Sequence, residues 1–244
     1  MARFTGERRA LAAAVMAFYA FIFFLVAMAP PPGWGACFAA LSGVYGLGFF
    51  ALVAGYFWAR WFAIGVGISG AVSAAISMWQ IGPEPVLVFW GATHVSASLI
   101  LWGSGMAKAF DGRAEWRARF HMDENATHKL GRAVIRAGIS LPYIVMYALA
   151  PRQDSMAELA VIGGAALAVT GIWALIRMRT WGIAAMAGGG VVLVSTLADS
   201  GFATAHGTGY TLDLTAVGLG AAMLLLAAVA PFVKPAARYV LKGQ

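Results

Sequence analysis

The stretch HMDENATH, at positions 121–128, places two histidines and two carboxylates close together in a chain that has few charges elsewhere. If a helix ran through it, His121, Glu124 and His128 would share one face, because they are spaced i, i+3 and i+7. Two imidazoles and a carboxylate are a ligand set that zinc accepts. The stretch is therefore a candidate metal site.

The same stretch also carries good helix-starting residues directly before an apolar segment: Asp123, Asn125 and Thr127. An acceptor side chain at the N-cap satisfies free backbone N–H groups, and acidic groups are favourable near the positive end of a helix. We therefore favour a joint that caps the following helix. A cytoplasmic metal site and a docking surface for a partner are the alternatives.

A second group of residues that could ligate a metal lies towards the expected outer side of the membrane, within spans, at their ends or in a loop: His94, Glu158, Asp199 and His206. Imidazole and carboxylate groups can hold a divalent cation or relay protons. No short ligand spacing joins these residues, so a site would need convergence from distant parts of the chain. Ordinary placement at the membrane interface is the simpler interpretation.

His94 lies within an apolar segment, in the stretch GATHVSAS. Thr93, Ser96 and Ser98 could satisfy its imidazole through hydrogen bonds between helices. Haem ligation would need a second ligand, and no other histidine stands well inside an apolar segment. No lysine stands mid-segment for a retinal Schiff base, and no phosphate-binding loop or nucleophile motif occurs. The sequence therefore predicts no enzyme and names no cofactor.

The elements that must position these residues follow from composition. Of the 244 residues, 61% are hydrophobic and 11% are charged, whereas soluble domains carry about a quarter charged residues. Apolar runs near the roughly 20 residues of a spanning helix recur along the chain. The prediction is an all-α polytopic membrane protein. Its net charge of +7 is spread between apolar runs rather than over a soluble face, so no nucleic-acid partner is expected.

Eight transmembrane helices are predicted, separated mainly by proline, charged or polar breaks. The predicted spans are 10–29, 36–58, 62–82, 86–107, 130–150, 157–176, 181–199 and 212–233. With the N-terminus inside, every one of the 17 Lys and Arg residues except Arg152 falls on the inner side. This asymmetry fits the positive-inside rule. We expect an integral protein of the bacterial inner membrane with both termini in the cytoplasm.

The spans divide into two four-helix halves, 1–109 and 130–244, around a charged linker, 110–129. Because four is even, the halves would share one orientation, as in parallel repeats. Ala29-Pro30 and Ala150-Pro151 close the first helix of each half, which weakly supports a repeat. Glycines inside the spans predict close helix packing. The run 188–190 could alternatively mark an unwound transporter helix.

The linker and the start of the fifth helix carry cations and aromatic residues suited to the inner leaflet: Arg113, Trp116, Arg117, Arg119, Phe120, Arg132 and Arg136. A helix with a cationic and an aromatic face can lie along a membrane. Arginines near a helix end extend toward the headgroups. These residues are predicted to contact lipids or a partner.

Three functions remain open at this point. The first is an accessory or scaffolding subunit that packs against other membrane proteins and lipids. Few buried charges and many small residues favour it. The second is a small transporter or channel for a cation or proton, using the outer histidines and carboxylates. The third, an intramembrane metal- or haem-dependent enzyme, has the least support.

Overall fold

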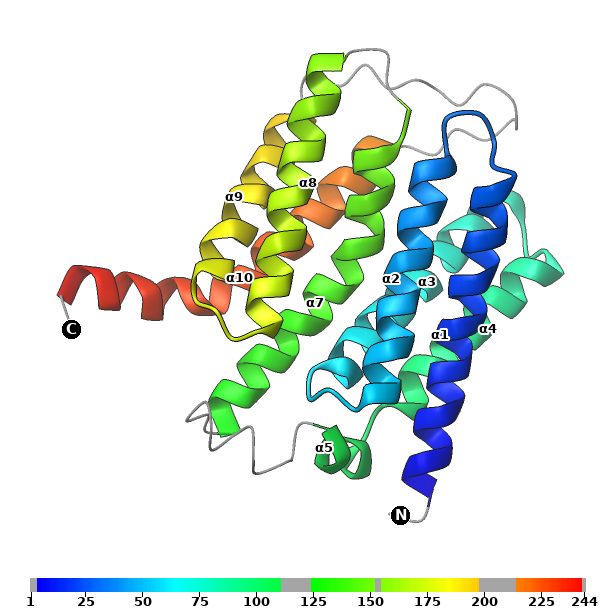
Figure 1. Cartoon of the computed structure of the whole chain (residues 1–244), viewed down its shortest axis with the longest axis horizontal. Coiled ribbons are helices and arrows are strands. Elements are labelled where there is room, and N and C mark those ends of the chain that lie inside the picture. The colour runs from blue at the N-terminus through cyan, green and yellow to red at the C-terminus, as the bar shows by residue number, and fades with distance from the viewer. Residues whose placement is uncertain (1–3, 111–123, 152–154, 198–213, 243–244) are drawn as a thin grey trace.

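The computed structural model describes residues 4–110, 124–151, 155–197 and 214–242. Within this part of the chain the regular structure consists of nine helices (Figure 1). The helices are α1 (Thr5–Met28), α2 (Gly35–Ala54), α3 (Ala59–Ile81), α4 (Pro85–Ile100), α5 (Ser104–Phe110), α7 (Glu124–Leu149), α8 (Ser155–Ile176), α9 (Trp181–Ser195) and α10 (Leu214–Lys242). The predicted all-α class is confirmed.

Six helices are long and apolar enough to cross a membrane: α1, α2, α3, α7, α8 and α10. The pair α4 and α5 is a seventh candidate, bent by 73° at the break between the two helices. The apolar helix α9 has 15 residues and is shorter than a usual span. The chain is a polytopic membrane protein with six or seven candidate spans by length and composition, and the predicted count of eight is not confirmed.

The fourth predicted span, 86–107, is wrong at its inner end, because α4 ends at Ile100 and the chain turns before α5. Gly103 has a φ of 106°, a conformation that glycine adopts without steric cost. The guanidinium of Arg8 on α1 donates from Nε to the Ile100 carbonyl at 2.7 Å and from Nη2 to the Trp102 carbonyl at 2.6 Å. These bonds satisfy carbonyls that the end of a helix leaves free.

Helix α2 ends at Ala54 rather than at the predicted residue 58, for a similar reason. Gly55 takes a left-handed φ of 73° and donates its N–H to the Ala51 carbonyl at 3.0 Å. Arg9 donates from Nε to the Leu52 carbonyl at 2.6 Å and from Nη2 to the Val53 carbonyl. Neighbouring arginines at the start of α1 thus cap the ends of two different helices.

The predicted start of the fifth helix is also corrected, whereas the joint itself stays a prediction. Helix α7 begins at Glu124, six residues before the expected start. Asn125 and Thr127 therefore lie inside its first turns and are not N-caps, while Asp123 lies outside the described residues. Thr127 is buried, so the apolar face of α7 already starts there.

Eight of the nine described helices pack as two sets of four, and the short α5 contacts α3 and α1. In the first set α1 packs on α2, α2 on α3, α3 on α4 and α4 on α1; in the second, α7, α8, α9 and α10 contact one another in the same cyclic order. Figure 1 shows the sets side by side, with α7 against α3 and α2. That the two halves are a true repeat stays a prediction.

Glycine determines how closely the two sets approach. A Cβ on Gly65 of α3 would lie 2.4 Å from the Ile135 carbonyl of α7, and one on Gly138 would lie 2.9 Å from the Phe62 carbonyl. Such distances are too short for any side chain, so α3 and α7 touch backbone to backbone. Small residues permit this approach in a membrane, where contact area replaces the hydrophobic drive.

The pair α8 and α9 is joined in the same way. A Cβ on Gly171 would lie 2.6 Å from the Met186 backbone nitrogen, and one on Gly182 would lie 2.7 Å from the Gly171 carbonyl. Helix α9 continues without a break through 188–190. In this structure the three glycines are therefore part of a continuous helix and not of an unwound one.

Candidate functional site

His94 is fully buried in the first set of helices, on α4. Its Nδ1 lies 2.8 Å from the Trp90 carbonyl oxygen, and its Nε2 lies 2.7 Å from the Tyr45 hydroxyl of α2. A carbonyl can only accept, so Nδ1 carries a hydrogen and Nε2 accepts from Tyr45 in the neutral ring. Both ring nitrogens are therefore engaged, and neither presents a free lone pair to a metal.

A glycine on α3 makes room for this imidazole. A Cβ on Gly70 would lie 2.0 Å from His94 Cδ2, so any larger residue would collide with the ring. One turn earlier, a Cβ on Gly67 would lie 2.3 Å from the Ser98 hydroxyl oxygen. The α3–α4 contact thus requires small residues opposite polar ones.

Tyr19 of α1 covers the other side of His94. The two ring centroids are 4.2 Å apart with planes tilted by 45°. The Tyr19 hydroxyl lies 2.6 Å from Thr93 Oγ1, which is itself 2.9 Å from the Phe89 carbonyl. Thr93 donates to the carbonyl, so Tyr19 donates to Thr93. Four helices thus meet around one histidine.

The partners of His94 differ from those expected. Thr93 pairs with Tyr19 instead of the imidazole, and Ser98 donates to the Ile64 carbonyl at 3.4 Å. The expectation that hydrogen bonds between helices satisfy the ring is met by Tyr45, which the sequence did not single out. A tyrosine in an apolar span gives little signal by itself.

Glu158, the other described residue of the predicted outer metal set, does not lie beside His94. Glu158 is exposed near the start of α8, in the other set of helices. Asp199 and His206 lie outside the described residues. Among the residues that the structure describes, no group of three or more His, Cys, Asp or Glu side chains could hold a metal ion. The outer metal site stays a prediction without structural support in this part of the chain.

Most of the predicted linker site lies outside the described residues, namely Arg113, Trp116, Arg117, Arg119 and Phe120, together with His121 of the candidate zinc set. Of the remaining members, His128 and Arg132 are exposed on α7. Both line a groove of ≈ 360 Å³ that Arg60, Trp61 and Trp102 also line. This groove gathers cations and indole rings at the end of the bundle where α1 begins.

Arg136 does not extend freely toward headgroups. Its guanidinium is half-buried, and Nη1 donates to the Ala227 carbonyl of α10 at 2.6 Å. Pro231, four residues further along α10, has no N–H to give that carbonyl. Arg136 therefore supplies the donor that the proline removes and ties α7 to α10.

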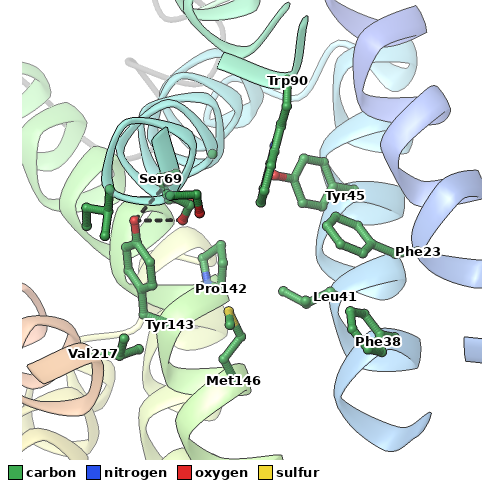
Figure 2. Close-up of a pocket in the computed structure, with 14 residues that line it drawn as sticks. Phe23, Phe38, Leu41, Tyr45, Ser69, Trp90, Pro142, Tyr143, Met146 and Val217 are labelled. Atoms are coloured by element: carbon green, nitrogen blue, oxygen red, sulfur yellow. Dashed lines mark hydrogen bonds between the residues drawn. The ribbon is translucent and has the colours of Figure 1, made fainter. Parts of the chain in front are cut away.

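A cavity of ≈ 180 Å³ lies between the two sets of helices, mainly between α2, α3 and α7. In Figure 2 Tyr143 and Ser69 stand opposite Phe23 and Phe38, with Trp90 and Tyr45 at the top and Met146 below. Charged side chains are missing from its described lining. On the predicted topology the cavity lies in the outer half of the membrane.

One wall of the cavity is polar. Ser69, Ser73 and Ser77 line it from α3 at four-residue spacing, so they stack on one helix face. The Tyr143 hydroxyl donates to the Ser69 carbonyl at 2.9 Å, and the Ser73 hydroxyl donates to the Tyr143 oxygen at 3.1 Å. The serine spacing was a readable sequence signal for this wall, but its partner Tyr143 on α7 was not.

Comparisons of the chain with protein-family models, curated proteins and solved structures find no match. The function must therefore be argued from the side chains and their surroundings.

Proposed function

We propose that this chain is a non-enzymatic accessory or scaffolding subunit of the bacterial inner membrane, with both termini in the cytoplasm. The observation that carries the proposal is the pairing of polar groups inside the spans. His94 is bonded at both nitrogens, and Tyr19 is bonded to Thr93. Polar groups inside membranes are often functional, but these are engaged in holding helices together.

The exposed surface of α1 supports contact with other membrane components. Phe18, Phe21 and Leu25, at i, i+3 and i+7, form one face and are 43%, 58% and 44% exposed. Such a face must be covered by lipid tails or by another helix. An aromatic stripe offers a large contact area at little cost in side-chain entropy.

The basic groove at the other end of the molecule supports lipid binding. Arg60, His128 and Arg132 gather there beside Trp61 and Trp102. Cations near the inner leaflet attract anionic headgroups, and tryptophan prefers the membrane interface. Anionic lipids are therefore proposed partners, beside other membrane subunits.

Native mass spectrometry of the full chain, released gently from the membranes of its own cells, tests this proposal. The expected spectrum contains a larger complex with foreign subunits and bound anionic lipid. Arg132→Gln is expected to reduce the bound lipid, whereas Arg177→Gln, whose guanidinium stacks 4.3 Å from the Trp173 ring centroid, is the control. Bare monomers or homo-oligomers without lipid would contradict the accessory role.

A small cation or proton transporter is the second candidate. The cavity between the two sets of helices favours it, because substrate sites of transporters lie between repeats. The backbone contact of Gly65 with Gly138 opposes it, since it closes the space between α3 and α7 next to the cavity. If this candidate holds, replacing His94, Glu158 or Asp199 abolishes flux in liposomes and leaves the protein folded.

A further inference from the structure

The cavity between α2, α3 and α7 has the size of one ring. Its volume of ≈ 180 Å³ compares with the about 150 Å³ of an apolar cavity that accepts benzene. Five aromatic side chains line it: Phe23, Phe38, Tyr45, Trp90 and Tyr143. Flat apolar walls favour a planar ring, which can pack face to edge against them.

The lining excludes a charged ligand. It carries hydroxyl groups but, among the described residues, no carboxylate, ammonium, guanidinium or imidazole. An ion placed there would lose its hydration without a counter-charge. The occupant is therefore neutral, and it reaches the cavity as a molecule soluble in the membrane.

The hydrogen bonds of the polar wall determine what the ring must carry. Ser73 and Tyr143 already donate their hydroxyl protons to protein atoms, and Tyr45 donates to His94. Their oxygens therefore remain as acceptors only. The Ser77 hydroxyl and the Trp90 indole N–H have no partner among the described residues, so both groups are free to donate. A ligand that pairs with this wall must therefore both donate and accept a hydrogen bond.

We infer that this cavity binds a neutral, membrane-soluble phenol: one aromatic ring whose hydroxyl donates its single proton to the Tyr143 oxygen, beside Ser73, and accepts from Ser77. A ring with only a carbonyl, such as a quinone, leaves that oxygen without this donor. A plain hydrocarbon ring leaves the Ser77 hydroxyl without an acceptor and gives the Tyr143 oxygen no further donor. The inference goes beyond the accessory role, because no partner protein takes part in it.

The binding test uses the full chain in lipid nanodiscs and fluorine NMR. Three ring probes of similar size are titrated: para-fluorophenol, para-fluorobenzonitrile, which only accepts, and fluorobenzene, which does neither. Empty nanodiscs measure partition into lipid. The expected result is saturable binding of the phenol, with the other two probes at least about five-fold weaker, the net worth of one hydrogen bond.

Variants locate the binding. Tyr143→Phe and Ser77→Ala are each expected to weaken para-fluorophenol about five-fold and leave fluorobenzene unchanged. The matched controls Tyr56→Phe and Ser195→Ala change exposed residues away from the cavity and are expected to have no effect. Ser73→Leu fills the cavity and is expected to remove binding of all three probes.

Three results would overturn the inference: no saturable component above empty nanodiscs, equal affinity for the three probes, or equal loss in the controls. Tighter binding of the nitrile than of the phenol would overturn the assignment of a hydroxyl. If Ser73→Leu does not fold, Tyr143→Phe and Ser77→Ala still decide, because they add no volume. None of these outcomes depends on whether the chain has partner subunits.

Discussion

The helices around His94 and the α8–α9 pair are held together by different means. In α1–α4 the contacts centre on polar side chains, with His94, Tyr45, Tyr19 and Thr93 bonded across α1, α2 and α4. In α8 and α9 the contact is made by backbone against backbone at Gly171 and Gly182. Both solutions replace the hydrophobic drive that helices lack in lipid. The difference teaches that a polar residue in a span can be a packing device as readily as a reactive group.

The largest effect is expected where backbones touch. Gly182→Ala puts a Cβ 2.7 Å from the Gly171 carbonyl, so α8 and α9 must separate. Overpacking of this kind costs about 1–3 kcal/mol. The free energy of unfolding, measured by denaturant titration in mixed micelles, is expected to fall by that amount.

Gly163→Ala is the control for that variant, since a Cβ there has open space. It is expected to leave stability unchanged or slightly raised. Equal losses in the two variants would mean that helix propensity, not close approach, explains the glycines.

The second effect concerns a polar tie in the α7–α10 set, between Arg136 and α10. Arg136→Ala removes the donor to the Ala227 carbonyl, and bonds from charged groups contribute about 1.5–3 kcal/mol. Unfolding free energy should fall toward that range, whereas Arg132→Ala, at an exposed position one turn earlier, should change it little.

Pro231→Ala sharpens this prediction, because it returns an N–H to the Ala227 carbonyl within α10. In that background Arg136→Ala is expected to cost less than in the natural sequence. An unchanged cost would show that Arg136 acts through something other than the carbonyl that the proline leaves free.

The smallest effect is expected at the edge of the polar network. Tyr19→Phe deletes a single hydroxyl bonded to Thr93, and hydrogen bonds between membrane helices average about 0.6 kcal/mol. The same titration should show a loss of that size, and Tyr56→Phe, at an exposed site, should show none. A loss of unfolding free energy as large as that of Gly182→Ala would contradict the expected difference between a polar contact and a backbone contact.

Membrane character and most helix positions could be predicted from the sequence, because hydropathy and prolines act locally along the chain. The end of α4 could not, since the break at Gly103 lies in an apolar run and depends on Arg8 from a distant helix. The role of Arg136 could not be predicted for the same reason. Its partner, the Ala227 carbonyl, is 91 residues away in the sequence and lacks a helical donor because of Pro231.

The candidate site was predictable only in part. The sequence singled out His94 as a polar residue in a span, but not the hydroxyl of Tyr45 or the space left by Gly70. The serines at 69, 73 and 77 share a helix spacing that the sequence displays. Their partner Tyr143 stands on a different helix, and only the α3–α7 packing brings it there.

The central claim is that the polar groups inside the spans stabilise the bundle, and a double-mutant cycle on His94 and Tyr45 tests it most directly. The unfolding free energy is measured for His94→Leu, Tyr45→Phe and the double variant. Both single variants are expected to be destabilised, with a favourable coupling of about 0.6–1.7 kcal/mol between them. Zero coupling, with His94→Leu as stable as the natural chain or more so, would contradict this claim and mark His94 as a functional residue maintained at a cost in stability.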